Sequence, residues 1–369
     1  MATKLNELAP ILVRNHLAGV NTLLRGKPGI GKTVTIMAYA ARMKERIPDF
    51  QLWTFYAPTM SPMDIQASAP DYDKGTLRLF NNEALPNAYT HPDAKGAVFF
   101  GELPNTDPAT AKLLQKYING EDMSGTLRKP DGVVVIADGN RLEDKSGVQQ
   151  QGRAFLNRFE QLDVYTDAND NIDYAIKQAW HPYVLTFFRD NPAAIDNYDE
   201  VFQTSASAAG KSPNPANDRL SEEGKTGVWA NMRAWERISK KEYAAEELGS
   251  PLTLGELIGN VGSGVAMAYN THKTMLLSLT SFEDIMADPD NAKLPTAVDE
   301  QYALSMLVAM RCTIEQLPKV KTYVQRMAME LQAAALKHIA QRKAFPIATS
   351  PAYIEWISDP QLAALLTGR

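Results

Sequence analysis

Eight consecutive residues near the start of the chain have the composition and spacing of a phosphate-binding loop. Residues 26–33 read Gly-Lys-Pro-Gly-Ile-Gly-Lys-Thr. Glycines let backbone N–H groups wrap around phosphates, and a following helix adds partial positive charge at its N-terminus. We expect Lys32 to neutralise the β- and γ-phosphates of ATP and the Thr33 hydroxyl to ligate Mg²⁺. The expected nucleotide-binding residues of this loop are Gly26, Pro28, Gly29, Ile30, Gly31, Lys32, Thr33 and Val34.

The residues on either side of this loop predict the elements that must position it. Residues 19–25 are mostly apolar and predict a short strand, and residues 34–41 predict a helix. The order of strand, glycine-rich turn and helix favours a true P-loop over a turn that ends in Lys-Thr by chance.

Two later strands each deliver a polar residue to the place where the strand ends. Glu102 follows the apolar run 97–100, and Asn140 follows the apolar run 133–137. Open parallel sheets bind ligands at the carboxyl ends of their strands. We therefore expect Glu102 to polarise the attacking water, and Asn140 to bridge that water and the γ-phosphate. The alternatives are a surface glutamate and a turn asparagine.

Two arginines at helix boundaries are candidates for binding the charge that develops on phosphate. Arg158 lies in Asn-Arg-Phe at residues 157–159, and Arg233 lies in Met-Arg-Ala-Trp-Glu at residues 232–236. Arginine suits this task because its planar fork donates two hydrogen bonds and stays protonated. At either position, the alternative is a surface salt bridge.

Short apolar strands alternate with helices up to about Asp167, and beyond it the sequence predicts only helices. Runs such as Val133–Ile136 lack polar alternation, as in strands that are covered on both faces. This alternation predicts an α/β fold with a parallel sheet flanked by helices. The expected strands are 22–24, 52–55, 97–100, 133–137 and 161–165, and the later helices are 171–190, 226–248, 253–270, 272–280, 299–315 and 319–343. Residues 203–227 are rich in Ser, Ala, Gly, Asn and Pro, which predicts a loop or mobile insertion.

The composition is that of an ordinary water-soluble protein. Of 369 residues, 44% are hydrophobic and 22% are charged, and the net charge of −5 gives no reason to expect tight binding to DNA or anionic membranes. The single cysteine, Cys312, excludes an intrachain disulfide and fits a reducing compartment. With no apolar run long enough to span a membrane and no signal-peptide pattern, we expect a cytoplasmic protein.

The order of these motifs resembles that of an AAA+ ATPase. The local sequence around the motifs is similar to that of the MoxR branch, mostly to its phage and prophage members. The segment Gly101–Pro108 resembles the Walker B region of that branch, residues 61–86 resemble its helix-2 insert, and residues 261–266 resemble part of its lid or C-terminal region. The resemblance implies an ATPase core over residues 1–168, a helical lid over 169–285 and a helical C-terminal extension over 286–369. It also implies a hexameric ring that hydrolyses Mg-ATP to remodel a protein partner, often together with a von Willebrand factor A domain protein.

Carried over position by position, the resemblance implies a role for each candidate residue. Lys32 and Thr33 bind phosphate and Mg²⁺, Glu102 is the catalytic base, and Asn140 is sensor 1. Arg158 is an arginine finger that acts on the nucleotide of a neighbouring subunit, and Arg233 is sensor 2 from the lid.

One position departs from the family pattern. The family has an aspartate, which holds a Mg²⁺-bound water, where this chain has Gly101. Such a loss typically lowers metal affinity or activity about 10–100-fold. Either hydrolysis survives on Glu102, Thr33 and a compensating group, or ATP is bound and hydrolysed slowly. The sequence offers no obvious replacement, since Asp107 is too far along the chain.

The two inserts are expected to be hairpins, over about residues 63–80 and 120–132. We hypothesise that Leu77, Leu79 and Phe80, or Met123 and Leu127, touch the substrate, the alternative being turns packed on their own domain. Two other functions remain open. One is an ATP-dependent DNA motor or helicase-like AAA+ protein, against which the acidic balance counts. The other is a nucleotide-gated structural ring with little hydrolysis, which Gly101 favours.

Overall fold

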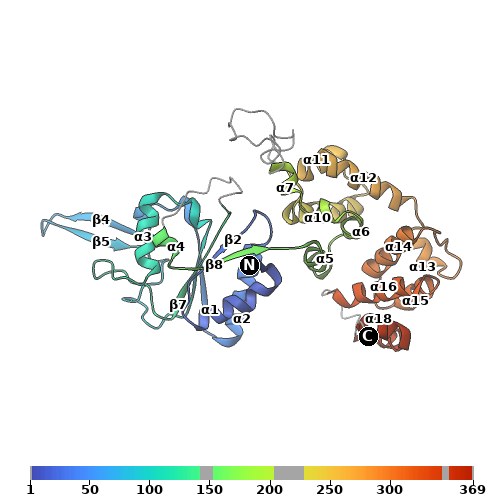
Figure 1. Cartoon of the computed structure of the whole chain (residues 1–369), viewed down its shortest axis with the longest axis horizontal. Helices are drawn as coiled ribbons and strands as arrows, with labels where there is room; N and C mark the ends of the chain where they lie inside the picture. Colours follow the sequence, from blue (N-terminus) through green and yellow to red (C-terminus); the bar gives the residue numbers. More distant parts are fainter. Residues whose placement is uncertain (1, 142–152, 203–227, 343–348, 368–369) are drawn as a thin grey trace. The chain divides into compact units, whose positions relative to one another are not determined.

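The computed structural model describes residues 2–141, 153–202, 228–342 and 349–367. By its internal contacts, the chain divides into two compact units, Met1–Asp167 and Ala168–Arg369. The first is drawn from blue to green in Figure 1 and the second from green to red. The insertion expected over residues 203–227 lies outside the described residues.

A six-stranded parallel sheet forms the centre of the first unit (Figure 1). All five predicted strands are confirmed, and the sheet also contains a short N-terminal strand, β1, that the sequence pattern did not predict. Strand β7 lies between β2 and β6, which brings the end of the P-loop strand beside the two later strand ends. In spatial order the strands are β1 (Thr3–Lys4), β8 (Glu160–Tyr165), β2 (Thr22–Arg25), β7 (Val133–Gly139), β6 (Gly96–Gly101) and β3 (Gln51–Tyr56).

Helices cover both faces of this sheet, which explains the continuous apolar runs at the centre of β6 and β7. On one face, Phe99 and Ile136 pack in a cluster with the helices α1 (Leu8–Leu17) and α2 (Lys32–Arg46). On the other face, Phe100 and Val135 pack in a cluster with α3 (Pro108–Ile118). Consecutive residues of one strand therefore belong to opposite cores, as the alternation of side chains along a strand requires. A short helix, α4 (Arg153–Leu156), precedes β8.

The two expected inserts differ in structure. The first is an antiparallel hairpin of β4 (Gln66–Asp71) and β5 (Thr76–Asn81), on which Leu77 is 68% and Phe80 is 52% exposed. The second is a compact turn whose only ladder contact, among the described residues, is a single bridge between Met123 and Leu127. Both of these side chains are buried in the α3 side of the core. The expectation that Met123 and Leu127 touch a substrate is therefore wrong, because the turn folds back on its own unit.

The second unit is entirely helical over its described residues, as expected. The predicted helix over 253–270 is divided at Gly262, whose φ of 83° interrupts the helix, and the one over 319–343 is divided before Ala328, whose backbone is extended. One hydrophobic cluster runs from Ala175 to Leu362. The helices of this unit are α5 (Ala168–Lys177), α6 (Pro182–Asp190), α7 (Tyr198–Phe202), α10 (Met232–Leu248), α11 (Leu254–Val261), α12 (Ser263–Leu277), α13 (Phe282–Ala287), α14 (Val298–Arg311), α15 (Leu317–Val324), α16 (Met329–Gln341), α17 (Pro351–Ile357) and α18 (Pro360–Thr367). Among the described residues, no helix combines the length and the apolar character that a membrane span needs.

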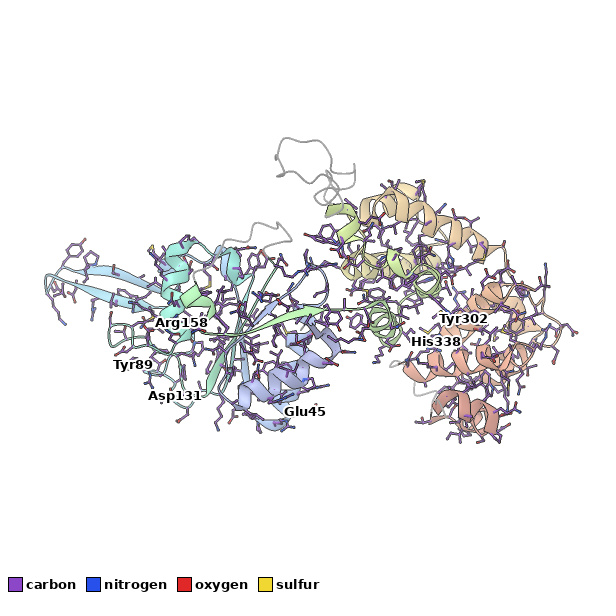
Figure 2. All side chains as sticks on the ribbon, in the orientation of Figure 1. Glu45, Tyr89, Asp131, Arg158, Tyr302 and His338 are labelled. Atoms are coloured by element: carbon purple, nitrogen blue, oxygen red, sulfur yellow. The ribbon has the colours of Figure 1, made fainter. Side chains whose placement is uncertain are left out.

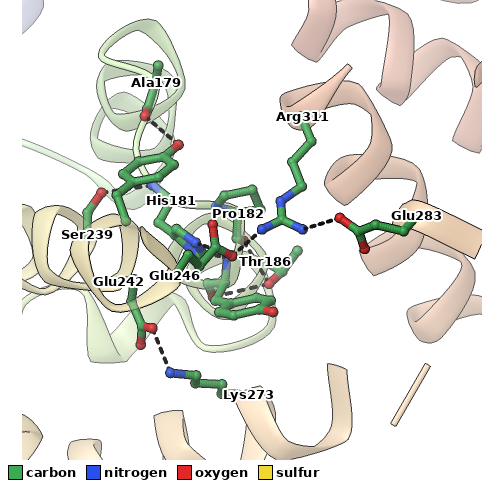
Figure 3. Close-up of polar contacts among 12 residues, drawn as sticks. Ala179, His181, Pro182, Thr186, Ser239, Glu242, Glu246, Lys273, Glu283 and Arg311 are labelled. Atoms are coloured by element: carbon green, nitrogen blue, oxygen red, sulfur yellow. Dashed lines mark hydrogen bonds and ion pairs between the residues drawn. The ribbon is translucent and has the colours of Figure 1, made fainter. Parts of the chain in front are cut away.

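A polar network joins helices inside this second unit (Figure 3). The buried Lys273 ammonium lies 2.6 Å from the Glu242 carboxylate, so α12 and α10 are held together by an ion pair. Glu246 of α10 lies 3.1 Å from the Nε2 atom of His181 and also pairs with Arg311 of α14. Unpaired charges are costly in an apolar interior, so the ion pair explains how the buried Lys273 and Glu242 side chains fit between α12 and α10.

Candidate active site

The P-loop lies at the carboxyl end of β2 and leads directly into α2. Its first residue, Gly26, donates its backbone N–H to the carbonyl of Gly139 at the end of β7, at 3.3 Å. Gly31 has a φ of 102°, a left-handed conformation that glycine adopts readily, and this turn directs the chain into the helix. Thr33 and Val34 are exposed in the first turn of α2, whereas Ile30 is buried.

Lys32 is the first residue of α2, and its side chain folds back over the loop. Its ammonium donates to the carbonyl of Gly26 at 2.8 Å and to that of Lys27 at 3.0 Å. A third contact, at 3.4 Å, joins it to the Oδ1 atom of Asn140. The structure therefore brings together two of the predicted site residues, Lys32 and Asn140, because β7 is the direct neighbour of β2 in the sheet.

Glu102 follows β6 in a left-handed backbone conformation, with a φ of 53°. Non-glycine residues in this region carry a cost of roughly 1–3 kcal/mol and cluster at functional sites. The Oε2 atom of Glu102 accepts hydrogen bonds from the Tyr56 hydroxyl at 3.0 Å and from the Asn105 amide at 3.1 Å. The hydrogen bond to Glu102 raises the pKa of Tyr56, so this hydroxyl stays a neutral donor at neutral pH. The Glu102 carboxylate is thus oriented by two side chains, Tyr56 and Asn105, that were not predicted from the sequence.

Close packing between β7 and the turn after β6 supports this arrangement. A Cβ atom on Gly139 would lie 2.5 Å from the ring of Pro104, so only glycine allows the turn to approach the strand. Glu102, which precedes this turn, is thereby held beside the end of β7.

Asp138 is a second carboxylate at the site, and it was not among the residues predicted from the sequence. It lies on β7, is 7% exposed, and accepts the backbone N–H of Glu102 at its Oδ1 atom, at 2.9 Å. Burial raises the pKa of Asp138, while the Glu102 N–H and the Lys32 ammonium lower it. The available signal was a single charged residue inside the apolar run Val-Val-Val-Ile-Ala-Asp-Gly.

The two predicted arginines lie in different units. Arg158 is half-buried, and its Nη1 and Nη2 atoms each lie 3.0 Å from the amide of Gln115, on α3 of the same unit (Figure 2). Arg233 is exposed in the first turn of α10, in the helical unit. The roles of both arginines towards a nucleotide stay predictions.

The residues at the P-loop offer oxygen donors of the kind that Mg²⁺ uses. Mg²⁺ is usually held by one or two carboxylates together with substrate phosphates and water, not by a cage of protein ligands. The Thr33 hydroxyl and the Asp138 carboxylate fit this pattern. In the part of the chain that the structure describes, no group of three or more His, Cys, Asp or Glu side chains forms a metal cage.

Comparisons with known proteins add the following. No family model and no curated protein matches this chain. Among solved structures, it is similar to NtrX from Brucella abortus, with 16% identity and a TM-score of 0.38 over 90% of this chain and 67% of the other. It is also similar to ORC2 from Aeropyrum pernix, with 10% identity and a TM-score of 0.38 over 99% and 93% of the two chains. A RuvB variant from Thermotoga maritima has 13% identity and a TM-score of 0.33 over 96% and 86%. Similarity at these values does not indicate a function. The function is therefore proposed from the residues of the site itself.

Proposed function

We propose that this chain is an AAA+ ATPase of the MoxR branch that binds Mg-ATP and uses hydrolysis to remodel a protein partner. The observation that carries the proposal is a contact between the P-loop and the end of the neighbouring strand. The Nζ atom of Lys32 lies 3.4 Å from the Oδ1 atom of Asn140. A cationic loop and a polar amide at the carboxyl edge of a parallel sheet suit the binding of a triphosphate.

Each residue of the proposed site has a task in hydrolysis. Glu102 accepts a proton from the attacking water, whose oxygen forms a bond to the γ-phosphorus. The bond between that phosphorus and the β–γ bridging oxygen breaks, which leaves ADP and inorganic phosphate. Lys32 and Asn140 bind the γ-phosphate as its charge shifts towards the leaving group. Mg²⁺, when bound, neutralises part of the phosphate charge.

Assembly and partner binding complete the proposal. In the proposed ring, Arg158 approaches the nucleotide of the neighbouring subunit, and Arg233 approaches the nucleotide from the lid. The exposed apolar side chains of the β4–β5 hairpin, among them Leu77, Leu79 and Phe80, are the proposed contact surface for the protein substrate. A von Willebrand factor A domain protein is a proposed partner.

The test is nucleotide binding by a Lys32→Ala variant. Charge-assisted hydrogen bonds contribute about 1.5–3 kcal/mol, so ATP affinity should fall about 10- to 150-fold. Calorimetric titration with ATP measures this loss. Lys44→Ala is the matched control, because Lys44 is an exposed lysine on the same helix and should leave the affinity unchanged. Equal ATP affinity in the Lys32→Ala variant and the unmodified protein would contradict the proposal.

A further inference from the structure

The departure at Gly101 is matched by a carboxylate on the neighbouring strand. Strands β6 and β7 pair in parallel up to Phe100 and Ala137, so Gly101 and Asp138 are the next residues in register. Adjacent strands lie about 4.8 Å apart. Phe99 and Ile136, two residues earlier on each strand, both pack on the α2 face of the sheet. Because side chains alternate along a strand, Asp138 is directed to that face, beside the position that a side chain on residue 101 would occupy.

Asp138 also lies directly at the base of the P-loop. It pairs with Leu24 on β2, two residues before Gly26, and the next residue, Gly139, accepts the Gly26 N–H. The α2 face, to which Asp138 is directed, is the face on which Lys32 and Thr33 begin their helix. The Asp138 carboxylate therefore lies between the Glu102 backbone and the start of α2.

A buried carboxylate in an otherwise apolar strand requires an explanation. Burying such a group costs free energy unless it is paired or hydrogen-bonded. One oxygen of Asp138 accepts the N–H of Glu102. The Lys32 ammonium of the P-loop also stabilises the charged form of Asp138. A divalent cation beside Thr33 is a further partner that this donor set can hold.

We propose that Asp138 takes the place of the missing carboxylate at Gly101 and holds the Mg²⁺ ion, or one of its waters, beside Thr33. This inference rests on the proposed nucleotide site and deepens it. The metal-side carboxylate then comes from β7 instead of β6. The site accordingly retains the charge that hydrolysis requires, which favours an ATPase over a ring in which ATP is only structural.

The absence of a side chain at residue 101 follows from the same arrangement. A Cβ atom there would meet its nearest neighbours at 3.6–3.7 Å, which is ordinary contact, so an aspartate fits sterically. Two carboxylates in adjacent register positions would repel each other, however. Because Asp138 already supplies a carboxylate for Mg²⁺, an aspartate at residue 101 would add repulsion between two carboxylates without adding a ligand that the ion needs.

The test uses Asp138→Asn, because asparagine keeps an oxygen that accepts the Glu102 N–H while it removes the charge. Mn²⁺ replaces Mg²⁺ as the probe, and its binding to the protein with a non-hydrolysable ATP analogue is followed by electron paramagnetic resonance. We expect Mn²⁺ affinity to fall about 10–100-fold in the variant. Binding of ATP in the presence of EDTA should be unchanged. Asp107→Asn is the matched control, since Asp107 caps α3 at the surface and asparagine also caps helices.

Rescue distinguishes replacement from a general disturbance of the site. The double variant Gly101→Asp with Asp138→Asn should recover the Mn²⁺ affinity of the unmodified protein. Gly101→Asp alone should gain little, because the position is already served by Asp138. A 10–100-fold gain in Gly101→Asp alone, or unchanged Mn²⁺ affinity in Asp138→Asn, would overturn the inference. The inference stays testable even if the Asp138→Asn variant fails to fold, because the Mn²⁺ affinity of the Gly101→Asp variant is measured independently. Failure of the unmodified protein to bind ATP at all would instead overturn the proposed function.

Discussion

At the scale of single residues, Glu102 is the side chain whose surroundings are best organised for proton transfer. Its carboxylate is held by Tyr56 and Asn105, and its strained backbone is fixed by the hydrogen bond from its N–H to Asp138. A general base in this position contributes about 10²–10⁴-fold to a reaction rate. The hydrogen bonds from these two side chains hold the carboxylate in one orientation at the end of β6.

We therefore expect Glu102→Gln to lose about 10²–10⁴-fold in the rate of ATP hydrolysis while it still binds ATP. The amide keeps the shape of the side chain but cannot take a proton from water. Phosphate release in a single turnover measures the rate, and calorimetry measures the binding. Tyr56→Phe, which only removes an orienting hydrogen bond, should have a smaller effect. A Glu102→Gln protein that hydrolyses ATP at the original rate would show that another group is the base.

At the scale of elements, the helical unit contains a buried histidine between two helices. His338 on α16 is 7% exposed, and its Nε2 atom lies 2.9 Å from the Tyr302 hydroxyl on α14 (Figure 2). Burial lowers the pKa of His338 from 6.5 to about 4, with smaller contributions from the charges of Lys337 and Arg189. The folded chain thus keeps this imidazole neutral at pH values where the unfolded chain protonates it.

Acid should therefore destabilise the packing of α14 against α16. The unfolded chain binds a proton at His338 below pH 6.5, whereas the folded chain does so only near pH 4, so stability is present above the first value and is lost as the pH falls to the second. From about pH 7 to about pH 5, we expect His338 to account for a loss of roughly 2 kcal/mol in the free energy of unfolding. Urea unfolding of the unmodified protein and of His338→Gln at both pH values measures the difference. Equal pH dependence in the two proteins would contradict this expectation.

At the scale of the whole molecule, the proposed ring determines whether Arg158 has a nucleotide to act on. In the first unit its guanidinium lies against Gln115 on α3, so a role towards a neighbouring subunit requires an exchange of that contact. The proposal that assembly supplies this neighbour can be tested without knowledge of the substrate.

We expect the particle mass to rise from that of a smaller species to that of a hexamer when ATP and Mg²⁺ are added. Light scattering after size exclusion measures the mass. Arg158→Ala should reduce the rate of ATP hydrolysis by the assembled protein. Gln115→Ala should leave that rate unchanged, because Gln115 only contacts the Arg158 guanidinium within one subunit. A protein that stays monomeric under all conditions would leave Arg158 without a partner nucleotide and would exclude the ring.

The sequence predicted most reliably what consecutive residues build together. The P-loop and the five predicted strands are local patterns, and the structure has each strand where it was expected. The pairing of Lys32 with Asn140 could be anticipated from the rule that parallel strands end at one edge. The burial of Met123 and Leu127 could not be anticipated. A polar turn with two apolar residues has the same sequence pattern whether it projects from its domain or packs against it.

By itself, the sequence determined that this chain has a parallel α/β unit with a glycine-rich loop of the P-loop pattern, followed by helices, because those features depend on periodicity and on the chemistry of adjacent residues. Only the tertiary structure decided which carboxylate faces the loop. Asp138 and Glu102 are 36 residues apart in the chain, and their contact depends on β7 lying between β2 and β6. Strand order is set by the packing of the whole core. The local sequence around Gly101 therefore cannot indicate that an acidic residue, Asp138, lies on the neighbouring strand β7.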